Sequence, residues 1–144
     1  MKKWREFENK LNKTCLKYRV EKKALIEYIK VGATDDGRPK TSTVDFTGII
    51  SPDGQGYAFD AKTTENKTSF SFSNIKTHQF VFLEYYHDMG AESYFFIRFN
   101  NINNAGEFYK VPAIEIINEW KSGKKSVKLN FFKDEWITKI EEFL

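Results

Sequence analysis

Two acidic residues and one lysine in the middle of the chain could form a reactive group. Asp60 and Lys62 stand two positions apart in "GYAFDAKT", and Asp45 lies in the preceding segment "TVDFTGII". Both segments alternate apolar and polar residues around the turn-like "SPDGQG", so we expect a β-hairpin. Because side chains alternate across a strand, Asp60 and Lys62 should share one face of theirs. On the other strand, Asp45 should point away from the face taken by Val44 and Phe46.

The pairing register of this hairpin decides whether the three charged side chains meet. If Ile50 pairs with Tyr57, Asp45 lies opposite Lys62 and diagonal to Asp60. The Cβ atoms would then be about 5 Å apart directly and roughly 7–8 Å apart on the diagonal. A slip of one residue would place the charges on opposite faces of the sheet. The hypothesis of a shared site therefore depends on the register.

An amide side chain could join these charges from a following helix. We expect that helix to begin at Ser73 or Asn74 and to run to about Met89, where Gly90 can end it. Gln79 falls within its apolar side and therefore needs a hydrogen-bond partner. A backbone partner is the ordinary interpretation. The alternative is that Gln79 reaches the two carboxylates and offers its carbonyl oxygen to a metal ion.

Two neighbouring carboxylates repel each other unless one is protonated or a cation lies between them. Oxygen-only ligands favour a hard cation, Mg²⁺ with Mn²⁺ as a possible substitute. Such an ion could activate a water molecule and stabilise the transition state of phosphodiester cleavage, with Asp45 and Asp60 as catalytic ligands. Lys62 would neutralise the developing negative charge. From the residues alone, a metal-dependent phosphodiesterase and a structural ion pair remain equally open.

The remaining pattern predicts alternating helices and strands. Trp4, Phe7, Leu11 and Cys15 recur at helical spacing, so residues 3–18 should form an amphipathic helix with these side chains inward. Strands are expected at 24–31 and 93–99, and a short helix at "AIEIINEW". The end of the chain, "DEWITKIEEFL", is predicted to be a further amphipathic helix. We expect an α/β fold, a central mixed sheet with helices packed on it.

Composition limits the classes of function. With 144 residues, 40% of them hydrophobic, the chain suits one folded domain spanning residues 1–144. One cysteine excludes an intrachain disulfide and fits a reducing, cytoplasmic setting. No apolar run is long enough to span a membrane. Residues 1–30 hold ten Lys or Arg and four Glu, and "KSGKKSVK" is a second basic cluster. Such clusters could neutralise DNA phosphates, although solvated surface charge explains any single lysine as well.

The longer motif resembles the RecU-type Holliday junction resolvases, which belong to the PD-(D/E)xK nuclease superfamily. The short pattern Asp45 … Asp60-Ala61-Lys62 alone is weakly specific, since an acid followed two residues later by lysine is common. The specific elements of the resemblance are Thr43-Val44-Asp45, Asp60-Ala61-Lys62, Asn66-Lys67-Thr68-Ser69-Phe70, Ser73-Asn74-Ile75 and Thr77-His78-Gln79. Weaker likeness extends over most of the chain, from "ENKLNKTCLKYR" to "KDEWITKIEEFL".

This resemblance implies a restriction-endonuclease-like core and a homodimer that makes paired, symmetric nicks across a four-way DNA junction in recombination and repair. It implies four metal ligands, and Lys62 as the group that stabilises the transition state. It also implies that the segment from Asn66 to Ser69 contacts phosphates. Glu8 lies where related nucleases often keep a further acid, but we expect a surface or capping role for it. The implied ligands are Thr43, Asp45, Asp60 and Gln79, and the implied DNA contacts are Asn66, Lys67, Thr68 and Ser69.

Two departures from the family pattern bear on the substrate. The family usually has glutamate where this chain has Asp60, although the superfamily motif permits either acid. RecU proteins also carry a long stalk where this chain has only "GATDDGRPKTS". Arg38 and Lys40 could replace part of the stalk's DNA contacts in a reduced, for example phage-encoded, relative. A duplex-cutting nuclease of the same superfamily, or a non-catalytic DNA-binding protein, is the alternative.

Overall fold

The first twenty residues form the helix that their apolar spacing predicts. In this computed structural model, which describes residues 2–29 and 44–144, α1 spans Lys3–Val20. Phe7, Leu11 and Cys15 of α1 are buried, as expected, but Trp4 is 41% exposed and lies outside the core. The prediction for Trp4 was therefore wrong. None of the helices in the described part is long and apolar enough to cross a membrane.

Six strands form one mixed sheet in the order β1-β2-β3-β5-β6-β8. Its neighbouring strands pair antiparallel except for β3 and β5, which are parallel. The confirmed fold class is thus a mixed α/β sheet covered by helices. The strands are β1 (Ala24–Tyr28), β2 (Phe46–Ile50), β3 (Gln55–Thr64), β5 (Glu92–Phe99), β6 (Glu107–Pro112) and β8 (Ile137–Lys139).

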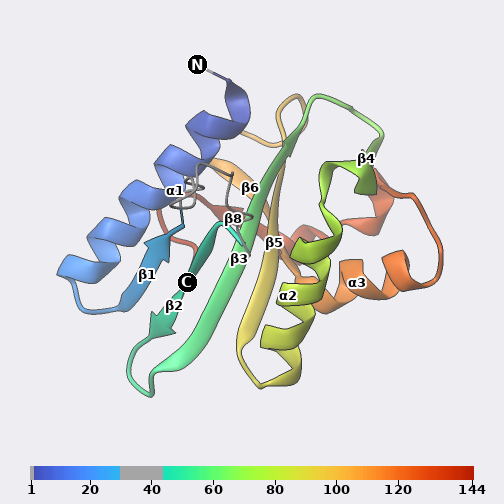
Figure 1. The fold of residues 1–144 in the computed structure, drawn as a ribbon. Helices are drawn as coiled ribbons and strands as arrows, with labels where there is room; N and C mark the ends of the chain where they lie inside the picture. Colours follow the sequence, from blue (N-terminus) through green and yellow to red (C-terminus); the bar gives the residue numbers. More distant parts are fainter. Residues whose placement is uncertain (1, 30–43) are drawn as a thin grey trace, which may run out of the picture.

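Helices cover both faces of the sheet (Figure 1). On one face, α1 packs over a row of stacked rings in which Phe59 lies 4.5 Å from Phe46 and 3.9 Å from Phe96 between centroids. On the other face lie α2 (Thr77–Asp88) and α3 (Ala113–Lys121). Ala58 belongs to this second layer. Tyr57, Phe59 and Ala61 therefore face α1 while Ala58 faces α2, which confirms the alternation predicted for β3.

A small second sheet joins the segment before α2 to the segment after α3. It pairs β4 (Ser69–Ser71) antiparallel with β7 (Ser126–Lys128). The segment "SFSFS", for which strand and extended loop were both open, contains β4 and continues into a 3₁₀ turn at Phe72–Asn74. The helix predicted to begin at Ser73 or Asn74 begins only at Thr77, because the chain is first held in that turn. Two further 3₁₀ turns lie at Leu129–Phe131 and Asp134–Trp136.

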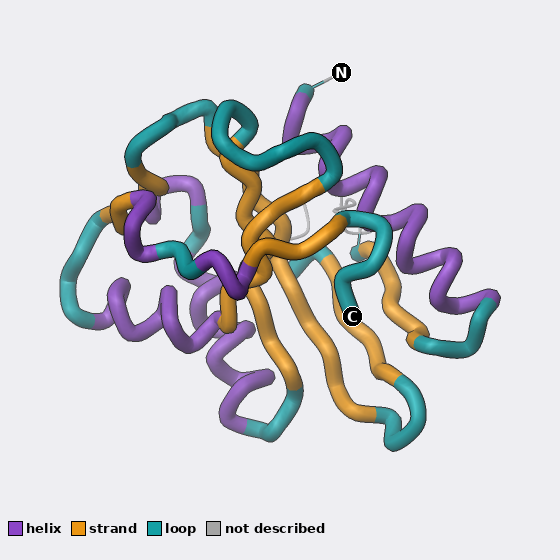
Figure 2. Tube along the Cα trace, turned by 180° about the vertical axis from the view of Figure 1, so that it is seen from behind, coloured by secondary structure: helices purple, strands orange, loops and turns teal. Residues whose placement is uncertain are grey.

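The end of the chain is not the helix that its spacing suggests. Figure 2 shows it as a short strand and a loop that ends over the sheet. Trp136 packs in the α2–α3 layer, whereas Ile140 and Phe143 pack in the α1 layer. A helix cannot present one apolar stripe to two opposite layers, while a chain that crosses the sheet edge and pairs with β6 through β8 can.

The hairpin forms, but two details of the expectation were wrong. Ile50 pairs with Gln55 rather than Tyr57, because the turn occupies four residues, with Gly54 at a φ of 69°. This register differs from the expected one by two residues, so the same faces are kept. Val44 packs in the α2–α3 layer, whereas Phe46 packs under α1. A bend at Asp45 interrupts the alternation before β2 begins.

Candidate active site

Asp45 lines a pocket of about 720 Å³ at one end of the sheet, and Asp60 lies fully buried beside it. Residues from α1 form one wall, the end of β1 and the start of β2 form the floor with β3, and the start of α2 forms the other wall. The pocket lies where β1 ends and β2 begins, so side chains from both layers can enter it. Its lining comprises Trp4, Arg5, Glu8, Asn9, Tyr28, Ile29, Asp45, Ala61, Lys62, Thr63, Asn74, Lys76 and Gln79.

The carboxylates of Asp45 and Asp60 each accept a hydrogen bond from a backbone N–H of the neighbouring strand segment. The N–H of Asp45 donates to Oδ1 of Asp60 over 3.1 Å. The N–H of Ala61 donates to Oδ2 of Asp45 over 3.0 Å. Continuing the β2–β3 register places Asp45 directly opposite Asp60, which is closer than the predicted diagonal. The two acids therefore have fixed positions beside each other.

Lys62 and Gln79 complete the group on the α2 side. Lys62 Nζ lies 3.0 Å from Oδ2 of Asp60, whose side chain is fully buried. The amide nitrogen of Gln79 donates to Oδ1 of Asp60 over 3.3 Å. Its carbonyl oxygen accepts from the backbone N–H of Lys76 over 3.0 Å. Gln79 thus makes the backbone hydrogen bond of the ordinary interpretation and also reaches Asp60, but it does so with its amide nitrogen, while its carbonyl oxygen faces Lys76.

Glu8 enters the same pocket from the α1 layer. It is buried, and its Oε1 accepts a hydrogen bond of 3.1 Å from the hydroxyl of Tyr28. The ring of Tyr28 stacks on Phe46 with centroids 4.8 Å apart, which holds the hydroxyl in place. The surface or capping role expected for Glu8 is therefore wrong. Its neighbours Phe7 and Leu11 turn this side of α1 toward the sheet.

Asp45, Asp60 and Glu8 bring three acids close together, while Arg5, Lys62 and Lys76 also line the pocket. Burial, followed by the charges of Asp60 and Glu8, raises the pKa of Asp45 to about 8. Burial also raises the pKa of Glu8, and Asp60 adds to that effect, while the Tyr28 hydrogen bond opposes it. The pKa of Tyr28 rises to about 12 because of burial and the nearby Glu8. The raised pKa means that this carboxyl group of Asp45 favours a bound proton, and a cation could replace that proton.

The donor set suits a hard divalent cation. Oδ2 of Asp60 is buried and accepts no well-aligned hydrogen bond from the described residues, although Lys62 lies at ion-pair distance. No three His, Cys, Asp or Glu side chains within residues 2–29 and 44–144 are arranged to hold a metal by themselves. A cation would thus bind Asp45, Asp60 and neutral oxygen donors, and Mg²⁺ typically keeps several waters.

A family model for RecU, described as "Recombination protein U", matches residues 2–143 of this chain. The chain belongs to the RecU family. This confirms the resemblance drawn from the motif around Asp45 and Lys62. The Holliday junction resolvase RecU of Leuconostoc mesenteroides is 37% identical over 90 residues, which cover 61% of this chain and 42% of that protein. The Staphylococcus carnosus protein of the same name is 32% identical over 94 residues, 65% of this chain and 43% of its own length.

The aligned part of this chain spans about two fifths of the length of these curated RecU relatives. A solved structure supports the fold independently of the sequence. Hjc from Archaeoglobus fulgidus, described as a Holliday junction resolvase from an archaeal hyperthermophile, superposes with a TM-score of 0.55 at 9% identity. The match covers 92% of this RecU chain and 96% of Hjc. At 9% sequence identity, this similarity shows a shared fold and nothing more.

The predicted DNA contacts that follow β3 do not line the carboxylate pocket. Asn66, Lys67, Thr68 and Ser69 follow β3, and none of them lines the pocket. Oδ1 of Asn66 accepts from the N–H of Thr68 over 2.8 Å and from that of Ser69 over 3.1 Å, so this side chain shapes the loop. Lys67 is exposed beside it. The remaining predicted residues, Thr43, Arg38 and Lys40, lie outside the described residues.

Sequence reasoning missed several side chains of this RecU pocket. Tyr28 ends β1 and Lys76 precedes α2, and neither belongs to a motif that suggests chemistry. Arg5 and Trp4 lie about one helical turn before Glu8, and this spacing was the one available signal that they share its side of α1. The decisive contacts join segments that are distant in the sequence.

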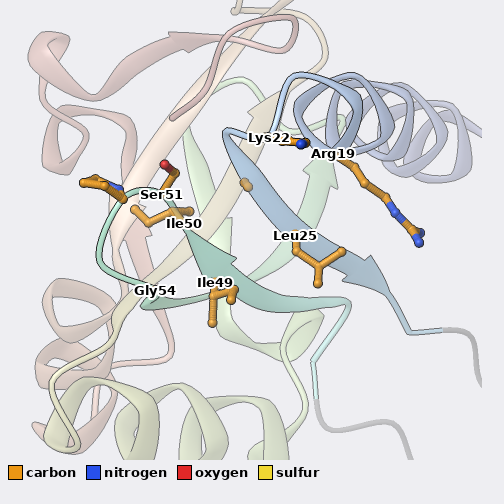
Figure 3. A pocket seen from close by; sticks show the side chains of 9 residues that line it. Arg19, Lys22, Leu25, Ile49, Ile50, Ser51 and Gly54 are labelled. Atoms are coloured by element: carbon orange, nitrogen blue, oxygen red, sulfur yellow. The ribbon is translucent and has the colours of Figure 1, made fainter.

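A second pocket, of about 390 Å³, lies at the opposite end of β1 and β2. Figure 3 shows Leu25 and Ile49 on neighbouring strands there, with Arg19 and Lys22 from the end of α1 and the turn after it. Its lining contains no acid, histidine or cysteine. It therefore offers neither metal ligands nor a general base, and the carboxylate pocket is the candidate active site.

Proposed function

We propose that this chain is a metal-dependent endodeoxyribonuclease that resolves four-way DNA junctions as a homodimer, by paired symmetric nicks. This proposal rests on one observation: Asp45, Lys62 and Gln79 line one pocket, and each of them contacts the buried Asp60 beside it. Membership in the RecU family and the names of its relatives support this choice of substrate. Two nicks in opposing strands require two such sites, which a homodimer supplies.

The proposed chemistry is hydrolysis of a phosphodiester bond. A divalent cation, Mg²⁺ with Mn²⁺ as a substitute, would be held by Asp45 and Asp60, with Gln79 and Thr43 as further ligands, and would supply an activated water and charge neutralisation. Lys62 remains beside Asp60 and presents its ammonium group to the pocket, where it offsets negative charge on the cleaved phosphate. A half-turn of the Gln79 amide would present oxygen instead of nitrogen to the carboxylates, at the expense of its bond to Lys76.

We expect further phosphate contacts outside the pocket, from the loop after β3 and from the segment before Thr43. Lys67 is exposed in the loop after β3 and can contact a DNA strand that leaves the pocket. We propose that Asn66 shapes this loop by accepting from the backbone N–H groups of Thr68 and Ser69, whose side chains would be the further phosphate contacts. Arg38 and Lys40 remain proposed contacts. Each lysine or arginine bound to a phosphate should add to the salt dependence of binding.

A cleavage assay with Mg²⁺ tests the function directly. We expect symmetric nicks in two opposing strands of an end-labelled, mobile four-way junction, and an intact linear duplex built from one of its arms. The physical reason is that a dimer with two fixed pockets matches the geometry of paired strands at a branch. Absence of any cleavage would contradict the proposed function. Equal cleavage of both substrates would favour the duplex-cutting alternative, which the short segment before Thr43 keeps open.

Metal binding should depend on pH because of the proton on Asp45. Its pKa is raised from 3.8 to about 8, so the folded state binds more protons than the unfolded state between these values. The free energy of unfolding of the metal-free protein should therefore fall as the pH rises from about 4 to about 8. A divalent cation displaces the proton and should restore stability, with a larger effect at high pH.

Thermal unfolding with and without Mg²⁺ at about pH 6 and about pH 9 measures this linkage. We expect a clearly larger metal-induced increase in melting temperature at the higher pH. In the variant D45N, which has no titrating acid at this position, the difference between the two pH values should shrink. An increase that is the same at both pH values in the unmodified protein would contradict the linkage to Asp45.

A further inference from the structure

A partly exposed indole lines the candidate active site. Trp4 is 41% exposed, although it begins the same apolar series of α1 as the buried Phe7 and Leu11. It belongs to neither core layer and lines the carboxylate pocket. Trp4 therefore presents a partly exposed aromatic ring at the candidate active site and not in the core.

The surroundings of Trp4 suit a nucleic acid strand. The guanidinium of Arg5 lies 5.2 Å from the Trp4 ring centroid, a distance typical of a cation–π contact that restricts the ring. Glu8 follows Trp4 by four residues, so their Cα atoms lie about 6 Å apart along the helix axis and the two residues share one side of α1. Lys76 and Asn74 line the pocket from the start of α2. A phosphate at the carboxylates would thus have basic groups beside it and an aromatic face about one helical turn away.

We propose that the Trp4 ring is a stacking platform for a nucleobase next to the cleaved phosphate, and that it favours branched over continuous duplex DNA. This inference rests on the proposed function. Stacking uses the face of a base and is therefore tolerant of sequence. Inside a continuous duplex both faces of a base are covered by its neighbours, whereas an interrupted stack at a branch leaves one face open. Trp4 would then contribute to the selectivity that the family's long stalk provides elsewhere.

Substitutions of Trp4 separate stacking from simple apolar contact. Binding is measured with a four-way junction and with a linear duplex of equal length, in the D45N background so that Mg²⁺ can be present. We expect W4A and W4L to weaken junction binding about tenfold, since one stacked base contributes on this scale. W4F should retain most of the affinity, because it keeps an aromatic face. Duplex binding should change much less in all three variants.

Fluorescence gives a second readout that does not depend on cleavage. The other two tryptophans differ from Trp4, since Trp136 is buried and Trp120 stacks on Phe80 with centroids 4.3 Å apart. Junction binding should quench tryptophan emission in the parent protein, and this quenching should largely disappear in W4F. The matched control is L16A, which removes another exposed apolar side chain of α1 outside the pocket. Melting temperatures should be unchanged throughout.

The outcomes distinguish this inference from the proposed function. If the unmodified protein cuts junctions but W4L binds them as well as W4F does, the stacking platform is wrong while the nuclease remains. Equal weakening on junction and duplex would overturn the proposed preference for branched DNA. If the unmodified protein neither binds nor cuts any DNA, the proposed function fails and the inference fails with it.

Discussion

Replacing Asp45 by asparagine is expected to abolish junction cleavage while changing junction affinity by no more than about twofold. The carboxylate of Asp45 lies beside Asp60, where an acid can bind a divalent cation, and asparagine removes that charge with almost no change in volume. Its side-chain oxygen can still accept from the N–H of Ala61, so the local structure should persist. Loss of a metal ligand should lower the cleavage rate by at least about a thousandfold.

The measurement combines single-turnover cleavage of a labelled junction with a binding titration. D53N is the matched control, because it makes the same substitution at an exposed residue of the β2–β3 turn and should leave both quantities unchanged. Cleavage by D45N at the normal rate would show that Asp45 is not a catalytic ligand. A parallel loss of binding and cleavage would instead indicate a role in holding DNA.

Replacing Gly48 by valine is expected to destabilise the whole fold by more than about 3 kcal/mol, enough to unfold a marginally stable domain. Gly48 lies in β2 between Ile26 of β1 and Tyr57 of β3. A Cβ atom at this position would lie 1.9 Å from the carbonyl oxygen of Leu25 and 2.6 Å from the Cα atom of Ile26. Both are backbone atoms, so relief requires β1 and β2 to separate.

Urea unfolding gives the free energy of unfolding for this comparison. The milder variant G48A introduces the same Cβ and should already destabilise clearly if valine prevents folding altogether. The neighbouring substitution I49A is the control, since Ile49 is 48% exposed and should change the free energy of unfolding by about 0.5 kcal/mol or less. Stability of G48A equal to that of the unmodified protein would show that the strands can move apart at little cost.

Short-range periodicity was sufficient for much of the fold. Alternation in "GYAFDAKT" correctly placed Asp60 and Lys62 on the face opposite Phe59, and the helical spacing of Phe7 and Leu11 correctly predicted α1. These patterns succeed because a strand or a helix has a fixed repeat that the local sequence must match. They failed at the chain end, where Trp136 and Phe143 pack on opposite faces of the sheet.

The family, the acid pair with its lysine and the faces on which they lie could all be predicted from sequence patterns. The burial of Glu8 beside Asp45, with its hydrogen bond from Tyr28, could not. Nor could the position of Trp4, which lines the pocket instead of entering the core. The physical reason is that these contacts join α1, the end of β1 and the start of β2, whose relative positions come from packing on both sides of the sheet rather than from any local repeat.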